Sequence, residues 1–225
     1  EQPIAARLIA TITVTEEVKM SIFQKSDIGA QAAWKGFSSQ TLYIASRLIS
    51  DEGGYEYYPE DIEDLVVKKN GAIVEAVQVK NISADLTLSS LAATKTSKGG
   101  EGFFNRMCSL HAQNPFFHRI KVVYFNTLGV ELQEMQSGKA VTQKALTKRL
   151  VDKHGLSESE AVWLIDSLCF EKVNLDDLDL NIQTQISDYV PVMSAPALAK
   201  DLLIQYISVL SKSKGYTTLK MWQDK

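Results

Sequence analysis

Cysteine is scarce in this chain of 225 residues: Cys108 and Cys169 are its two cysteines. Neither belongs to a CxxC or Cys/His pattern, which argues against a zinc site. Both lie in apolar stretches with helical spacing, so we expect two buried thiols and a reducing, cytoplasmic environment. The sequence also lacks an apolar run of about 18 residues and a signal-peptide pattern at its start, so we expect no membrane-spanning helix and no membrane partner.

A nucleotide-binding P-loop is absent as well. Residues 94–102, TKTSKGGEG, form a basic, glycine-rich segment that does not match GxxxxGK[ST], and that motif occurs nowhere else in the chain. We therefore do not expect an NTPase site within these residues. The remaining composition is that of an ordinary globular protein, with 45% hydrophobic residues, 23% charged residues and a net charge of −3.

Positive charge is concentrated in one segment. Residues 65–125 contain eight Lys or Arg and three acidic residues, whereas the rest of the chain is acidic. This distribution fits an anionic ligand that binds at one face. Solvated surface lysines would give the same count, so the pattern alone does not decide between these interpretations.

A β-hairpin is the feature around which the chain is predicted to be organised. Residues 65–67 form a short β-branched run, Asn70-Gly71 is the signal of a tight turn, and residues 72–79 form a second strand. Before the hairpin we expect a loop and a long helix over 27–50 and a strand over 55–58. After it we expect an extended piece over 82–91 and helices over 103–112, 141–153, 158–170, 183–190 and 196–212. We also expect a buried strand over 120–126, an irregular stretch over 127–140, and a strand-like link over 171–182. This order indicates an α/β fold.

Polar side chains lie at the two ends of the hairpin strands. Asp64 enters the first strand, and Gln78 and Lys80 leave the second strand on one shared face. A carboxylate, an amide oxygen and the Val79 carbonyl could bind Mg²⁺, and an ammonium group could stabilise a phosphate or orient water. Acids before a strand and a lysine after it are also everyday surface features, so this spacing by itself is weak evidence.

The motifs in their order resemble the PD-(D/E)XK nuclease fold. The matching residues are Gly29-Ala30, Ala33, Gly36-Phe37, Gln40, Glu60, Glu63, Asp64, Val66, Val67, and the run Val77-Gln78-Val79-Lys80. The pattern is similar to the double-stranded DNA endonuclease domain of bacterial anti-phage effectors, including the CBASS-associated endonuclease and the Avs- and Lamassu-type nuclease modules. This resemblance implies a restriction-endonuclease-like core, a mixed sheet flanked by helices, followed by a C-terminal helical extension.

The resemblance also implies roles for individual residues. Asp64 would be the metal-binding acid, Gln78 would replace the usual second acid, and Lys80 would be the catalytic lysine. Asp27 and Asp61 offer competing carboxylates, so the ligand set stays open. Glu60 and Gln40 would support the site, with Mg²⁺, or alternatively Mn²⁺, as the cofactor. Contacts with double-stranded DNA would come from three basic residues, Lys95, Lys98 and Arg106.

The resulting prediction is a Mg²⁺-dependent endonuclease that cleaves double-stranded DNA as an anti-phage effector. It divides the chain into an N-terminal extension (1–26), a nuclease core (27–138) and a mainly helical docking or oligomerisation region (139–225). A sensor or NTPase would act as a partner or fused domain, and the chain could form a homo-oligomer. Two alternatives stay open: a catalytically inactive nuclease-fold module for binding or assembly, and a restriction- or repair-type nuclease outside defence.

Overall fold

The computed structural model describes residues 28–93, 100–138, 140–189 and 196–223. The predicted N-terminal extension, 1–26, lies outside these ranges. The helices are α2 (Ile28–Ile49), α3 (Leu88–Ala92), α4 (Phe103–Gln113), α5 (Val130–Gln136), α6 (Ala140–His154), α7 (Glu158–Ser167), α8 (Leu175–Tyr189), α9 (Pro196–Ser213) and α10 (Leu219–Gln223). The strands are β1 (Tyr55–Pro59), β2 (Leu65–Lys69), β3 (Ala72–Lys80), β4 (Ile120–Tyr124) and β5 (Leu168–Lys172).

The chain divides into two compact units, Glu1–Phe37 and Ser38–Lys225. The described part of the first unit is the beginning of α2, where the rings of Trp34 and Phe37 lie with their centroids 6.3 Å apart. The second unit contains the sheet and all the other described helices.

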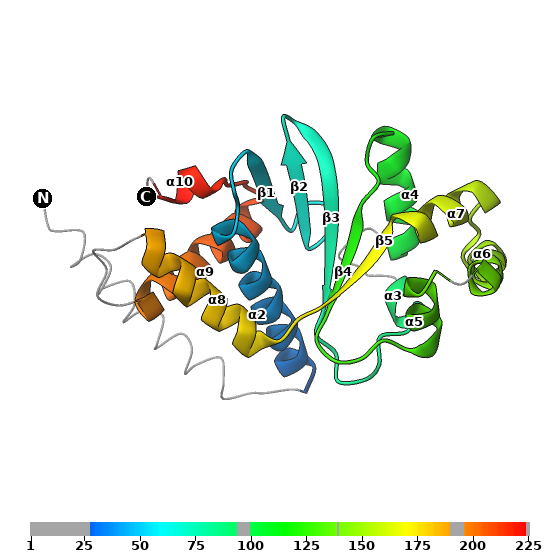
Figure 1. Ribbon diagram of the computed structural model, residues 1–225, viewed down its shortest axis with the longest axis horizontal. Helices are drawn as coiled ribbons and strands as arrows, with labels where there is room; N and C mark the ends of the chain where they lie inside the picture. Colours follow the sequence, from blue (N-terminus) through cyan, green and yellow to red (C-terminus); the bar gives the residue numbers. More distant parts are fainter. Residues whose placement is uncertain (1–27, 94–99, 139, 190–195, 224–225) are drawn as a thin grey trace, which may run out of the picture. The chain divides into compact units, whose positions relative to one another are not determined.

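The sheet has five strands in the order β1-β2-β3-β4-β5 (Figure 1). The pairs β1–β2 and β2–β3 are antiparallel, whereas β3–β4 and β4–β5 are parallel. Helices cover both faces of this mixed sheet, which confirms the coarser prediction of an α/β fold with a mixed sheet flanked by helices. The parallel pairs need long crossovers, and α3 to α7 supply them.

The central hairpin forms as its sequence predicts. Asn70 and Gly71 both have positive φ, 52° and 77°, which is the backbone of a type I′ turn. This turn matches the twist of β2 and β3 and pairs Lys69 with Ala72, and a register shift between Val67 and Lys68 then places Leu65 opposite Val77. The register therefore brings the entry of β2 next to the exit of β3, where the candidate residues lie.

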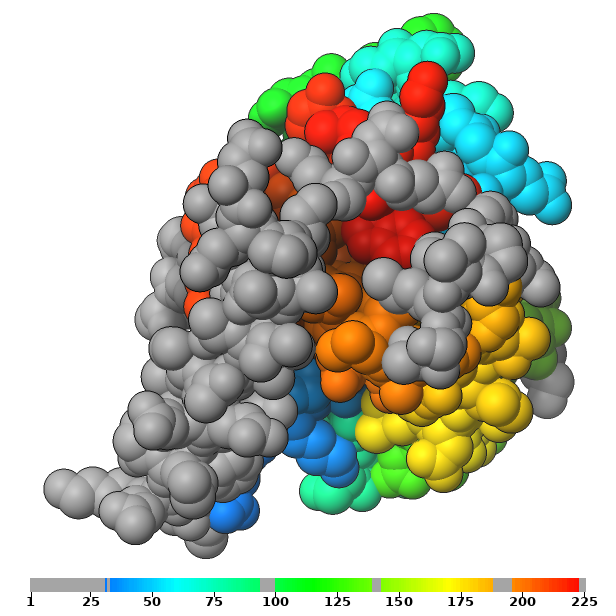
Figure 2. Space-filling view, turned by 90° about the vertical axis from the view of Figure 1, so that its left-hand side faces the viewer, coloured from blue at the N-terminus to red at the C-terminus, as the bar shows by residue number. Residues whose placement is uncertain are grey.

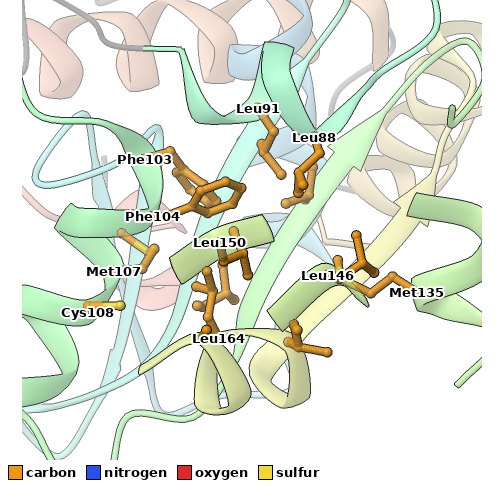
Figure 3. Packing of buried hydrophobic residues seen from close by; sticks show 14 of the residues in the cluster. Leu88, Leu91, Phe103, Phe104, Met107, Cys108, Met135, Leu146, Leu150 and Leu164 are labelled. Atoms are coloured by element: carbon orange, nitrogen blue, oxygen red, sulfur yellow. The ribbon is translucent and has the colours of Figure 1, made fainter. Parts of the chain in front are cut away.

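Alternation along the strands separates two hydrophobic cores, one on each face. On one face, α2, α8 and α9 pack on Leu65, Val67, Val77 and Val123. On the other face, α3 to α7 pack on Ala76, Ile120 and Val122. Figure 3 shows the second core, in which Phe103, Phe104 and Met107 of α4 meet Leu150 of α6 and Leu164 of α7.

The first core is closed by the C-terminal helices. Figure 2 shows parts of α8 in yellow and α9 in orange next to each other on the face that it draws. Beyond α9, Thr217 exchanges two backbone hydrogen bonds with Tyr57, with N···O distances of 2.8 and 2.9 Å. This bridge pairs part of the edge strand β1, which would otherwise present open hydrogen-bonding groups.

Three predicted elements in the second half of the chain are wrong. Residues 127–140 contain the helix α5, because Leu132 and Met135 bury one face at a spacing of three. The helix predicted over 158–170 ends at Ser167, and its last residues begin β5. The strand-like link over 171–182 is mostly α8, whose buried Leu178, Ile182 and Ile186 recur at helical spacing.

Two further sequence predictions concern the cysteines and the region 139–225. Cys108 is buried in α4 as expected, but Cys169 lies in β5 and is only half-buried. Because β5 pairs with β4, the region 139–225 supplies a strand to the sheet as well as helices. Its role in docking or oligomerisation stays a prediction. Within the part of the chain that the structure describes, no helix has the length and apolar character needed to cross a membrane.

The capping box at the start of α7 gives a prediction for stability. The Ser157 hydroxyl accepts a hydrogen bond from the Glu160 backbone N–H, and the Glu160 carboxylate accepts from the Ser157 N–H at 2.8 Å. We expect Ser157→Ala to lower the free energy of unfolding by about 1 kcal/mol. Urea unfolding measures this loss, and a variant as stable as the wild type would contradict the role of the cap.

The same cap implies a pH dependence. The hydrogen bonds from Ser157 lower the pKa of Glu160 below its usual value. Its stabilisation is therefore present above the unfolded-state pKa and is lost as the pH falls through the lower, folded-state pKa. The stability difference between the wild type and Glu160→Gln should accordingly shrink between neutral pH and a pH of about 3.

Candidate functional site

The acid and the amide predicted from the hairpin lie together in the structure. Asp64, just before β2, is 3% exposed, and Gln78, near the end of β3, is 1% exposed. The Asp64 Oδ2 atom accepts a hydrogen bond from the Val79 backbone N–H at 2.8 Å and another from the Gln78 side-chain amide. The hairpin thus gathers Asp64, Gln78 and Val79 into one buried polar group, which we call the Asp64 cluster.

One polar atom of this cluster lacks a partner. Among the described residues, the buried Gln78 Oε1 atom accepts no hydrogen bond. A buried oxygen without a partner is unfavourable by roughly 1–3 kcal/mol, so its presence needs an explanation. A half-turn of the amide about its terminal bond would bring Oε1 beside the Asp64 carboxylate. Two oxygens facing each other are stable only when a cation or a donor lies between them.

Gln40 and Glu60 adjoin this cluster, as the sequence predicts. The Gln40 side-chain amide, from α2, donates to Glu60 Oε1 at 2.5 Å and to the Asp64 carbonyl oxygen at 3.3 Å. Glu60 itself has a φ of 54°, a conformation that is uncommon for a residue other than glycine. The Glu60 N–H also donates to the Asp64 carbonyl at 3.1 Å, which closes the bend between β1 and β2.

Lys80 lies two residues beyond Gln78 at the end of β3, so strand alternation places both on the same side of the sheet. It is half-buried. The next residue, Asn81, donates a side-chain hydrogen bond to Ser39 Oγ of α2. This bond ties the exit of β3 to the helix that carries Gln40, and the sequence analysis did not identify it.

The donor set suits a hard divalent cation. Within the described ranges, no group of three or more His, Cys, Asp or Glu side chains could hold a metal ion. A cation at the Asp64 cluster would therefore rely on one carboxylate and neutral oxygens, namely Gln78 Oε1 and the Val79 carbonyl. In an antiparallel pair, the N–H and C=O of a residue point to the same neighbouring strand, so the Val79 carbonyl faces the side where Asp64 lies. Mg²⁺ accepts such oxygen ligands and keeps several waters.

The three residues predicted to contact DNA are not brought to this site as a surface. Lys95 and Lys98 lie outside the described residues. Arg106 is 7% exposed, and its Nε atom donates to Glu63 Oε1 at 2.7 Å in a buried ion pair. The prediction that Arg106 contacts DNA is corrected by this burial, because its guanidinium already binds a carboxylate inside the protein.

A second charged cluster lies on the opposite face of the sheet, and the sequence analysis missed it. Glu75 of β3 is 3% exposed, with Oε2 at 2.8 Å from Arg47 Nη2 and Oε1 at 3.6 Å from Lys121 Nζ. Lys121 also lies 2.7 Å from Glu171 Oε2, which accepts a hydrogen bond from the Tyr43 hydroxyl at 3.2 Å. The sequence feature that could have indicated this cluster is Glu75, because an acid there lies on the same inward face of β3 as Val77 and Val79.

The Tyr43 hydroxyl is held in its protonated form in this network. Burial raises the pKa of Tyr43 well above its usual value, and the carboxylates of Glu171 and Glu75 add to that effect. The phenol is therefore a neutral donor, and the network acts as a structural brace between α2 and strands β3, β4 and β5. Both oxygens of Glu75 lie in ion pairs, although Oε1 accepts no hydrogen bond from the described residues. The Asp64 cluster is the stronger candidate site because it combines a carboxylate with the neutral oxygens that a hard divalent cation accepts.

Comparisons with known proteins give a likeness in structure alone. No protein-family model matches the chain, and no curated protein matches it. Among solved structures, the chain resembles the "Acinetobacter baumannii Cap4 SAVED/CARF-domain containing receptor with the cyclic trinucleotide 3'3'3'-cAAA", with a TM-score of 0.55 and 18% identity over 84% of this chain and 43% of that chain. The structure of the same receptor named without a ligand gives a TM-score of 0.53 and 16% identity, over 84% of this chain and 45% of that chain.

These neighbours correct the predicted function. They are named as receptors with SAVED/CARF domains, one of them with a cyclic trinucleotide, and a double-stranded DNA endonuclease finds no support among them. The prediction of a DNA-cleaving effector is therefore wrong on this comparison. At 16–18% identity the likeness shows the fold, and the chain spans less than half the length of the receptors that it resembles.

Proposed function

We propose that this chain is a Mg²⁺-dependent, phosphodiester-binding module of a receptor that responds to a cyclic oligonucleotide. The observation that carries the proposal is the Asp64 cluster, in which the Gln78 amide donates to the buried Asp64 carboxylate while the amide oxygen has no partner among the described residues. Phosphodiesters are anionic, and a divalent cation is the usual means by which a carboxylate site binds them.

The setting of the module is supported by the structural neighbours. A fold that resembles a receptor with a bound cyclic trinucleotide is consistent with a part in the same kind of protein. On this proposal the mixed sheet is a restriction-endonuclease-like core that serves binding and assembly, in the anti-phage setting that the sequence resemblance implies. A sensor domain, fused or separate, and further copies of the chain are the partners that we propose.

Each residue at the Asp64 cluster has its own proposed role in binding the cation and the phosphodiester. Asp64 supplies the charge, and its Oδ2 atom accepts hydrogen bonds from the Gln78 amide and the Val79 N–H. With a cation bound, a turned Gln78 amide and the Val79 carbonyl would supply neutral oxygens. Gln40 holds both the Asp64 backbone and the Glu60 carboxylate. A bound Mg²⁺ would supply the positive charge that attracts a phosphate oxygen. Lys80, on the same side of β3 as Gln78, would contribute a second positive charge to the phosphodiester.

Phosphodiester hydrolysis at the same cluster is a second candidate, and the position of Lys80 two residues beyond Gln78 in β3 favours it. In that reaction the oxygen of a water molecule would bond to phosphorus, the ester bond to the leaving oxygen would break, and that oxygen would take up a proton. Lys80 would stabilise the charge that develops on the phosphate. Loss of one such group lowers the rate by about 10²–10³-fold in related electrostatic sites.

One titration tests the module. We expect isothermal titration calorimetry to detect binding of 3'3'3'-cAAA, the ligand named for the neighbouring receptor, in the presence of Mg²⁺. Chelation of Mg²⁺ should weaken binding about tenfold or more. Asp61→Asn is the matched control, because it removes a carboxylate from the same bend but outside the cluster, and it should bind as the wild type does.

The alternative outcomes separate the parts of the proposal. Binding of a linear tri-adenylate with no binding of the cyclic form would overturn the receptor role and keep the phosphodiester site. Absence of binding to either ligand would overturn the proposed function. Chromatography of the ligands after incubation tests the second candidate: products that require Mg²⁺ and are lost in Lys80→Ala support hydrolysis, and intact ligands contradict it.

A further inference from the structure

The orientation of the Asp64 carboxylate depends on the bend that carries Asp64 as well as on the Val79 N–H of β3. Pairing of β2 with β3 begins at Leu65, one residue after Asp64, and residues 61–64 form the bend that leads into β2. From the α2 side, Gln40 holds this bend through its hydrogen bond to the Asp64 carbonyl at 3.3 Å. The Glu60 N–H donates to the same carbonyl at 3.1 Å, so the Asp64 backbone is held from the β1 end of the bend as well.

The other side of the bend is held by α4. Glu63, the residue before Asp64, is fully buried, and its Oε1 atom accepts from Arg106 Nε at 2.7 Å. The Arg106 Nη1 atom also donates to the Glu101 carbonyl at 2.5 Å. Because the neighbouring Phe103, Phe104 and Met107 are buried in the core on this face (Figure 3), α4 holds the backbone of Arg106 in a fixed position.

We propose that the Arg106–Glu63 ion pair is a positioning pair for the Asp64 cluster. Gln40 and Arg106 come from helices that belong to the two opposite cores, so together they clamp the bend from both faces of the sheet. The clamp keeps the carboxylate aimed at Gln78 and the Val79 N–H. This inference rests on the proposed function, since its measurable consequence is the affinity of the cluster for a divalent cation.

The ion pair positions Asp64 through the peptide bond that joins Glu63 to Asp64. Without Arg106, the Glu63 carboxylate would be a buried charge that has lost its cationic partner, and it would move toward water. That movement would rotate the adjoining peptide and carry Asp64 away from Gln78. Groups that orient a metal ligand without touching the metal commonly change its affinity about 10–100-fold.

The test compares substitutions of two buried cations on opposite faces of the sheet. Arg106→Met removes the clamp, and Arg106→Lys keeps its charge but loses the fork that reaches both Glu63 and Glu101. Lys121→Met is the matched control, because Lys121 is 8% exposed, pairs with Glu171 and lies in the other core. The readout is the Kd for Mn²⁺ by calorimetry, well below the unfolding temperature, with near-ultraviolet circular dichroism as the check on folding.

We expect the Kd of Arg106→Met to rise about tenfold or more and that of Arg106→Lys to rise less. Lys121→Met should lose stability while its Kd for Mn²⁺ stays unchanged. If the role of Arg106 were merely structural, Arg106→Met would behave in the same way as Lys121→Met. If Arg106→Met does not fold, Arg106→Lys decides. A wild-type Kd in the folded Arg106 variants would overturn the positioning role, whereas a wild-type protein that binds no Mn²⁺ would overturn both this role and the proposed cation site.

Discussion

Substitution of Asp64 by asparagine should abolish the stabilisation of this protein by divalent cations. For the wild type, a cation present at 100 times its Kd would add about 2.7 kcal/mol to the free energy of unfolding. For a chain of this size, that gain corresponds to a rise in Tm of about 5–10 °C. The asparagine side chain keeps the size and one oxygen of the aspartate but removes its charge, so the Tm of the variant should be the same with and without Mn²⁺.

The control for this experiment is Asp61→Asn, whose cation-dependent rise in Tm should equal that of the wild type. Without cation, Asp64→Asn should unfold close to the wild-type temperature, because an oxygen is retained to accept the hydrogen bond from Val79. A rise in the Tm of Asp64→Asn as large as that of the wild type would place the cation elsewhere in the protein.

Substitution of Glu75 by glutamine should give the largest loss of stability. The carboxylate of Glu75 is 4% exposed and faces Arg47, Arg119 and Lys121 at distances of 2.8, 3.2 and 3.6 Å. A neutral glutamine would leave these cations without the nearest compensating charge, and removal of one partner from a buried ion pair lowers stability by about 3–5 kcal/mol. Because Arg119 is half-exposed and Glu171 still pairs with Lys121, we expect a loss of about 3 kcal/mol.

Chemical denaturation measures this loss, with the exposed Glu52→Gln as the control that should stay within about 0.5 kcal/mol of the wild type. The affinity of Glu75→Gln for Mn²⁺ should be unchanged, because the Glu75 network and the Asp64 cluster lie on different parts of the sheet. A Glu75→Gln variant as stable as the control would show that the network contributes little to the fold.

The hairpin and its polar ends could be predicted from the sequence because their signals are local. Asn70-Gly71 specifies the turn that joins β2 to β3, and the antiparallel pairing of these strands brings Asp64 to Gln78. The register shift between Val67 and Lys68, which also sets this pairing, was not predicted. The long helices α2 and α9 were equally clear from their apolar spacing. By contrast, β5 is a short strand whose residues continue the apolar pattern of α7, so periodicity alone did not separate the two.

The partners of buried charges could not be predicted in this way. Arg106 follows a basic, glycine-rich segment, which suggested an exposed nucleic-acid contact, yet the packing of α4 turns it toward Glu63. That contact joins residues 43 positions apart, and no local pattern reports it. Glu75 is a similar case. An acid at an inward position of β3 indicates a buried charge, but the sequence does not indicate which cations pair with it.

The most direct test of the divalent-cation site is anomalous X-ray scattering from crystals grown with Mn²⁺. We expect an anomalous peak within bonding distance of the Asp64 carboxylate, with the Gln78 amide turned so that its oxygen faces the ion and the Val79 carbonyl as a further ligand. A peak at another position, or crystals in Mn²⁺ with water or an empty space between Asp64 and Gln78, would contradict the claim that this cluster is a divalent-cation site.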